Sequence, residues 1–95
     1  MKLQKLPMAP PADPRVIEQR LRDFISAEFM SGQPPDFDRN GSLLQSGIID
    51  SIGLFRLVFF LQDAFRLPVP SEDISTENFQ TLADIVRYVE QRVRG

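Results

Sequence analysis

Residues 47–65 read GIIDSIGLFRLVFFLQDAF, and this stretch decides the fold. Serine favours helix starts, and the apolar residues after Ser51 recur at the spacing of an amphipathic helix. We therefore predict a helix that begins at Ser51 and ends at Phe65 or Arg66, before the Leu67-Pro68-Val69-Pro70 segment. We expect Ser51 to be its N-cap, so that Ser51→Ala would cost about 1 kcal/mol of stability.

The predicted helix has two faces. Its core face is wholly apolar and consists of Leu54, Leu57, Val58, Leu61 and Phe65. The opposite face combines polar residues with three large apolar ones: Arg56, Gln62, Asp63 and Arg66, with Ile52, Phe55 and Phe59. Either neighbouring segments cover the three apolar residues, or they form an exposed patch that marks a docking surface for a partner. Phe60 lies between the faces, where we expect it to pack on a short third helix.

Three further helices are predicted around this one. Asp13 and Pro14 form a helix start, and the helix runs to about Met30, because Gly32 and Pro34-Pro35 stop it. The connection 32–50 is long for a compact domain, which suggests a function. Ser71 caps a short helix at about 72–76, and Thr81 caps the last helix, whose apolar stripe is Leu82, Ile85, Val86, Val89 and Val93.

No segment alternates with period two long enough to suggest a sheet. The fold class is therefore all-α: a small four-helix bundle with three longer helices, one short helix and a long loop between helices one and two. Residues 1–12 are interpreted as a flexible leader and residues 13–95 as the single domain.

Composition excludes several classes of function. The 95 residues contain no Cys and no His, which argues against disulfides, thiolate zinc sites and serine–histidine hydrolases. A net charge of −2 gives no basic footprint for nucleic acid. No apolar stretch approaches the ~20 residues that span a bilayer, so we expect no membrane insertion. We take the reducing cytoplasm as the default location, and we expect a monomer.

Ser51 lacks the histidine base that would make it a nucleophile, but its position favours a phosphate. The unpaired amides and partial positive charge of a helix N-terminus would stabilise a phosphodiester there.

The segment Gly47-Ile48-Ile49-Asp50-Ser51-Ile52 resembles the attachment motif of the acyl and peptidyl carrier protein family. Phe65, Val69-Pro70 and Asn78-Phe79-Gln80-Thr81-Leu82 resemble the family's later pattern, so that the similarity spans about residues 14–93. The resemblance implies a non-catalytic chain with a 4′-phosphopantetheine arm, transferred from coenzyme A onto Ser51, which bears acyl or aminoacyl groups as thioesters. Asp50 belongs to the same motif.

The resemblance also implies partners: a phosphopantetheinyl transferase, an acyl- or aminoacyl-activating ligase, and the synthases or transferases of fatty-acid-like, polyketide, nonribosomal peptide or aminoacyl-transfer pathways. The second helix is slightly basic, since Arg56 and Arg66 oppose only Asp63. Docking should therefore depend more on Ile52, Phe55 and Phe59 than on charge, with Arg56 beside them. The spacing between Gly47 and Asp50 is similar to that of stand-alone D-alanyl and aminoacyl carriers.

The sequence leaves open the position of the carried acyl or aminoacyl group, which we call the cargo. The cargo could fold back into the bundle near Val58, Leu61, Ile74 and Phe79, or stay in solvent.

Three other functions were weighed. Residues 36–41 match the start of an EF-hand calcium loop, but its twelfth position is Gly47 instead of a glutamate, and a polar turn is the simpler interpretation. A small enzyme could use Asp50, Asp63 and Asp73, although nothing in the sequence pairs them. The main alternative is an unmodified helical interaction domain that docks through Ile52, Phe55 and Phe59.

Overall fold

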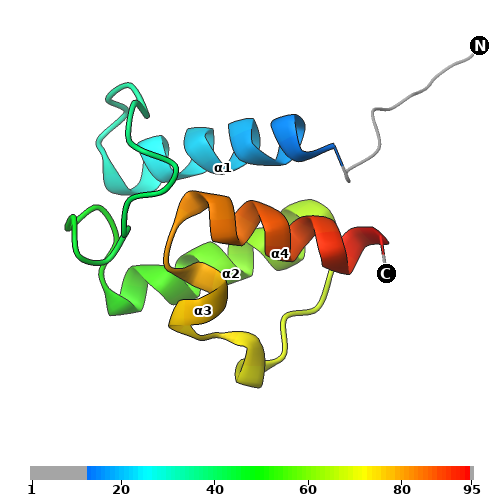
Figure 1. The fold of residues 1–95 in the computed structure, drawn as a ribbon. Coiled ribbons are helices and arrows are strands. Elements are labelled where there is room, and N and C mark those ends of the chain that lie inside the picture. The colour runs from blue at the N-terminus through cyan, green and yellow to red at the C-terminus, as the bar shows by residue number, and fades with distance from the viewer. Residues whose placement is uncertain (1–12, 95) are drawn as a thin grey trace, which may run out of the picture.

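The computed structural model describes residues 13–94, and the predicted leader 1–12 lies outside the described residues. The described chain is all-helical (Figure 1). Its elements are α1 (Pro14–Phe29), α2 (Ser51–Phe65), the short 3₁₀ helix η2 (Ser71–Asp73), α3 (Thr76–Phe79) and α4 (Leu82–Arg94). In Figure 1 the long loop lies at one end of the molecule, while the start of α1 and the end of α4 lie at the other.

Helix α4 is the central element, since it packs on α1, α2 and α3. The apolar stripes of the long helices form one core, and Ile17, Leu21 and Ile25 of α1 are fully buried. The core also includes Leu57, Val58, Leu61 and Phe65 of α2, Leu82, Ile85, Val86 and Val89 of α4, and Leu43 and Ile49 of the loop.

Helix starts follow local chemistry. The Asp13 carboxylate accepts a hydrogen bond from the Arg15 amide at 3.0 Å, and Pro14 occupies the first helical position. The Thr81 hydroxyl accepts one from the Asp84 amide at 3.0 Å. The predicted caps Asp13 and Thr81 are therefore confirmed. The predicted cap Ser71 is wrong, because Ser71 is the first residue of η2 and its side chain makes no capping hydrogen bond.

The short third helix was misplaced. Instead of one helix at 72–76, the structure has η2 and then α3, separated by Ile74 and by Ser75, whose backbone is extended. The Asn78 side chain donates to the carbonyl oxygen of Asp73 at 2.8 Å, and α3 ends with Phe79 buried in the core. Burial of Phe79 places the helical turn later than the local sequence suggests.

Phe60 also differs from expectation. Its observed aromatic partner on another helix is Phe24 of α1, on which it stacks with ring centroids 4.2 Å apart. This aromatic contact joins α1 and α2, because Phe24 and Phe60 project from facing sides of the two helices.

The long loop is tied to the bundle at several points. The Arg22 guanidinium donates to the carbonyl oxygens of Pro35 at 2.6 Å and Phe37 at 3.0 Å, and lies 4.7 Å from the centre of the Phe37 ring. Farther along, the Leu43 amide donates to the carbonyl oxygen of Gln80 at 2.9 Å. The loop thus has a defined path that delivers residue 50 to the start of α2.

Candidate functional site

Ser51 is exposed at the first residue of α2, but it is not the helix cap. The cap is Asp50, whose carboxylate accepts a hydrogen bond from the Gly53 amide at 2.6 Å. The prediction that Ser51 caps the helix is therefore wrong, because the carboxylate one residue earlier has the extended backbone and the reach that a cap requires. The Ser51 hydroxyl makes no hydrogen bond with another described residue.

Gly53 lets the first turn of α2 approach the end of α1. A Cβ atom at this position would lie 2.8 Å from Cε1 of Phe29 and 3.0 Å from Oδ1 of Asp50. Both distances are shorter than normal contact, so only glycine fits without displacing the aromatic ring or the cap. No role was predicted for Gly53, although a glycine inside a strongly apolar helix is a signal of close approach.

A hollow of ≈ 390 Å³ lies beside Ser51. Its lining includes both chain neighbours of Ser51, Asp50 and Ile52, together with Gly53 and the side chains of Glu28 and Arg56. The Arg56 guanidinium forms an ion pair with Glu28 at 3.4 Å. Both side chains are largely exposed, so this pair contributes little stability.

Three large apolar side chains on α2 are exposed, and we call them the docking patch: Ile52 (74% exposed), Phe55 (51%) and Phe59 (65%). Of the two interpretations of these residues, the structure supports exposure over coverage by a neighbouring segment. Arg56 lies among them on the same helix. An exposed apolar patch of this kind is typical of a surface that meets other proteins.

The residues named for a cargo pocket belong to the core. Val58, Leu61 and Phe79 are buried, and Ile74 is half-buried against the same cluster.

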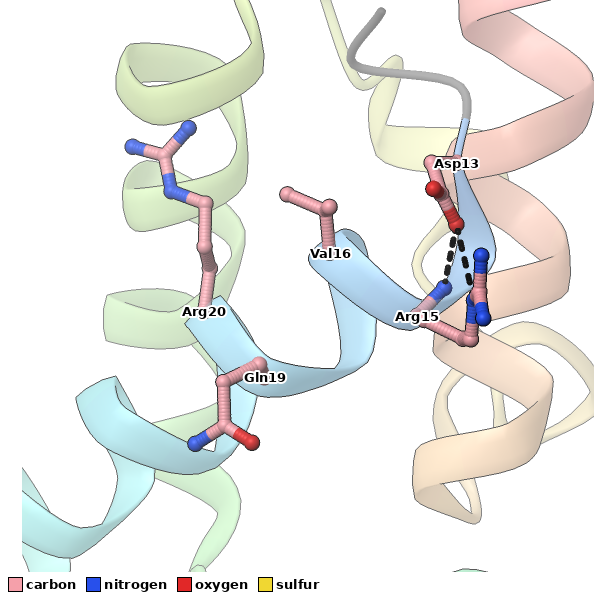
Figure 2. Close-up of a pocket in the computed structure, with 5 residues that line it drawn as sticks. All are labelled: Asp13, Arg15, Val16, Gln19 and Arg20. Atoms are coloured by element: carbon pink, nitrogen blue, oxygen red, sulfur yellow. Dashed lines mark hydrogen bonds and ion pairs between the residues drawn. The ribbon is translucent and has the colours of Figure 1, made fainter. Parts of the chain in front are cut away.

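A larger hollow of ≈ 480 Å³ lies at the start of α1, far along the helix from Glu28 (Figure 2). Figure 2 shows Arg20 extending towards α2, and its guanidinium lies 5.1 Å from the centre of the Phe65 ring at the far end of α2 from Ser51. This hollow is therefore not part of the site around Ser51.

The EF-hand-like segment is a polar turn. The Asp38 carboxylate accepts a hydrogen bond from the Asn40 amide at 2.9 Å, and Arg39 pairs with Glu18 of α1 at 3.0 Å. Among residues 13–94, no group of three or more acidic, His or Cys residues lies close enough together to hold a metal ion. No helix in the same range is long and apolar enough to cross a membrane.

A family model described as the phosphopantetheine attachment site matches residues 19–89, which is most of the chain. The chain belongs to the phosphopantetheine carrier proteins. Members of this family are carriers and not enzymes, and they hold 4′-phosphopantetheine covalently.

Two curated relatives illustrate the range of the family. The carrier is 28% identical over 76 residues to the probable acyl carrier protein PigG of Serratia sp. (strain ATCC 39006), covering 80% of this chain and 87% of the relative. It is 27% identical over 75 residues to the D-alanyl carrier protein of Streptococcus pyogenes serotype M1, covering 79% and 92%.

The residues at the start of α2 fit the family's cofactor. The Ser51 hydroxyl is exposed, the cap is supplied by Asp50, and the first amides of α2 have no helical carbonyl partner. A phosphodiester on Ser51 would lie close to these amides and to the positive end of the helix dipole. The bound arm would supply a thiol, which a chain without cysteine lacks.

Proposed function

We propose that the carrier receives its 4′-phosphopantetheine arm on Ser51 and presents acyl or aminoacyl groups to partner enzymes as thioesters of that arm. The observation that carries this proposal is the division of roles at the start of α2. Asp50 satisfies the Gly53 amide, and the exposed Ser51 hydroxyl is left for modification. Asp50 thus acts as the residue that positions Ser51.

In this scheme, partner enzymes recognise the carrier through the docking patch. Ile52 is next to Ser51, while Phe55 and Phe59 follow one and two turns later, so that a partner seated on the patch has the arm at its edge. Apolar contacts of this kind are less sensitive to salt than charge pairs. Arg56 is the charged member of the surface.

The partners in this proposal are a phosphopantetheinyl transferase, a ligase that activates the acyl or aminoacyl group, and a synthase or transferase that uses it. The relatives named above include both an acyl and a D-alanyl carrier, which supports either cargo. We propose that the carrier works as a monomer in the cytoplasm, in a fatty-acid-like, polyketide, nonribosomal peptide or aminoacyl-transfer pathway.

Intact mass tests the attachment residue. After incubation with coenzyme A and a broad-specificity phosphopantetheinyl transferase, the parent chain should gain one arm, and Ser51→Ala should gain none. Ser71→Ala is a matched control, because Ser71 is also exposed and is also the first residue of a helical segment. It should gain one arm like the parent. An arm on Ser51→Ala would refute the assignment.

The exposed docking patch also favours a second candidate, an unmodified helical domain that binds a partner through Ile52, Phe55 and Phe59. If the parent chain gains no arm and carries none beforehand, this second candidate would be the supported function.

A further inference from the structure

The arm begins at α2, so a carried group that entered the bundle would lie in the core beneath that helix. Leu61 and Phe79 are 0% and 1% exposed, and Val58 is 3% exposed. A side chain with so little accessible surface touches no void large enough for a water molecule, whether open or enclosed. The core at these residues is therefore already filled.

Phe79 is the residue that fills it. It has the largest of the fully buried side chains, and its ring lies 5.2 Å from that of Tyr88 on α4. In Figure 1 α3, which ends at Phe79, lies beside α4, on which it packs. An apolar chain could enter here only if this ring moved.

The segment that carries Phe79 is fastened at both ends. Before α3, the Asp73 carboxylate accepts a hydrogen bond from the Tyr88 hydroxyl at 2.8 Å and lies 3.6 Å from the Arg92 guanidinium. After α3, the carbonyl oxygen of Gln80 accepts one from the amide of Leu43 at 2.9 Å. Opening the core would break these contacts as well as displace Phe79.

Burial and the hydrogen bond to Asp73 raise the pKa of Tyr88 to about 12. The hydroxyl therefore stays protonated, and keeps donating to Asp73, throughout the neutral pH range.

We propose that Phe79 closes the bundle to the carried group, so that this carrier keeps its cargo outside the core and takes groups that need no burial, namely short or polar acyl and aminoacyl groups. The inference rests on the proposed function and specifies its class of substrate. Phe79 is a specificity-determining residue in this scheme.

A series of loaded carriers tests the proposal. The broad-specificity transferase is given acetyl-, butyryl- or octanoyl-coenzyme A as its substrate. It forms the bond between Ser51 Oγ and the pantetheine phosphorus and breaks the pyrophosphate bond, which releases adenosine bisphosphate. Intact mass checks each product, and thermal unfolding gives its Tm. The Tm of the octanoyl form should lie within about 2 °C of that of the acetyl form, because a chain left in solvent does not stabilise the fold.

Substitutions that open space in the core at Phe79 should make the Tm depend on the length of the carried group. Phe79→Leu replaces the ring with a smaller aliphatic group. Phe79→Ala removes nearly the whole side chain and leaves an apolar cavity that can accept an apolar ligand. The acetyl forms of both variants should have a lower Tm than the parent, and the octanoyl group should restore about 4 °C or more. Phe37→Leu is the matched control, since it makes the same change in the long loop and should show no dependence on chain length.

The parent series decides the question even if Phe79→Ala does not fold. An octanoyl parent carrier that unfolds about 4 °C or more above the acetyl form would overturn the inference and leave the carrier function intact. Hydroxylamine cleavage of the thioester gives a second readout, and a rate that falls with chain length in the parent would also overturn it. A parent that gains no mass would refute the proposed function and this inference together.

Discussion

Asp50 and Ser51 are adjacent in the chain but act in different ways at the start of α2. The Asp50 carboxylate holds the Gly53 amide at 2.6 Å and thereby fixes the first turn of the helix. Ser51 contributes an exposed hydroxyl and no contact that the fold requires. Stability and modification should therefore respond to different substitutions at these two positions.

At pH 7 we expect Asp50→Ala to lower the free energy of unfolding by about 1 kcal/mol, because it removes the cap. Asp50→Asn should restore most of this loss, since asparagine is an equally good cap. Ser51→Ala should change stability by less than about 0.5 kcal/mol. Urea unfolding of the three variants measures these differences, and equal losses in Asp50→Ala and Ser51→Ala would contradict the assignment of the cap.

At the scale of the element, α2 places two neighbouring phenylalanines in opposite environments. Phe59 is 65% exposed in the docking patch, whereas Phe60 stacks on Phe24 of α1. The two residues have the same side chain on the same helix, so comparing them separates partner recognition from packing.

We expect Phe60→Ala to destabilise the fold by about 2 kcal/mol or more, because it leaves the Phe24 ring without its partner. Phe59→Ala should cost less than about 0.5 kcal/mol. Phe59→Ala should instead reduce the rate of arm transfer, measured as kcat/KM with the phosphopantetheinyl transferase, while Phe60→Ala should transfer normally under conditions in which it is folded. Equal stability losses in the two variants would show that Phe59 belongs to the core.

The predictions for the elements succeeded where the sequence pattern is longer than one helical period. The three long helices each show several turns of apolar spacing, and their bounds were close to those observed. The region 71–79 has too few residues for a period, so its helical turns depend on where Phe79 reaches the core and on the contact between Asn78 and Asp73. Phe60 was misassigned because a residue between two faces is placed by its neighbouring helices, which periodicity does not specify.

At the scale of the whole molecule, one half-buried carboxylate, that of Glu18, links α1 to the long loop. Glu18 accepts hydrogen bonds from Arg22 at 3.2 Å and Arg39 at 3.1 Å. Burial acts to raise the pKa of Glu18, but the hydrogen bonds and positive charges of the two arginines outweigh it, and the pKa lies below its ordinary value of 4.5. A carboxyl group whose pKa is lower in the folded state than in the unfolded state stabilises the fold at pH values above its unfolded pKa. This stabilisation is lost as the pH falls through the pKa of the folded state.

Glu18→Gln should therefore lower stability at pH 7, by less than about 1 kcal/mol because the group is partly solvated. At a pH well below 4.5, where Glu18 is protonated in the parent too, the two proteins should converge. Unfolding free energies measured from pH 7 down to the acid transition test this, and a constant difference across that range would contradict it. Glu28→Gln is a matched control, because its ion pair with Arg56 is more exposed and it should show a smaller effect.

The all-helical bundle and the long loop were accessible from the sequence, because they depend on periodicity and helix breakers. The role of Ser51 stays a prediction from a short motif. The surroundings of Ser51 were not accessible from the sequence. Glu28 and Phe29 come from a helix more than twenty residues earlier, and their approach to α2 depends on the crossing of two helices. The cap was assigned to Ser51 because two adjacent residues can both cap a helix, and only the backbone path decides between them.

The close contact at Gly53 has a consequence for how this carrier tolerates substitution. Ser51 and Gly53 are two residues apart, and both should reject nearly every other amino acid when a library of variants is selected for carrier activity. The grounds for rejection differ, because substitutions of Ser51 would yield folded, abundant and inactive protein, while those of Gly53 would push Phe29 away and deplete the folded protein itself. Measuring protein abundance as well as activity for each variant would therefore distinguish Ser51, which is required for its hydroxyl, from Gly53, which is required because it has no side chain.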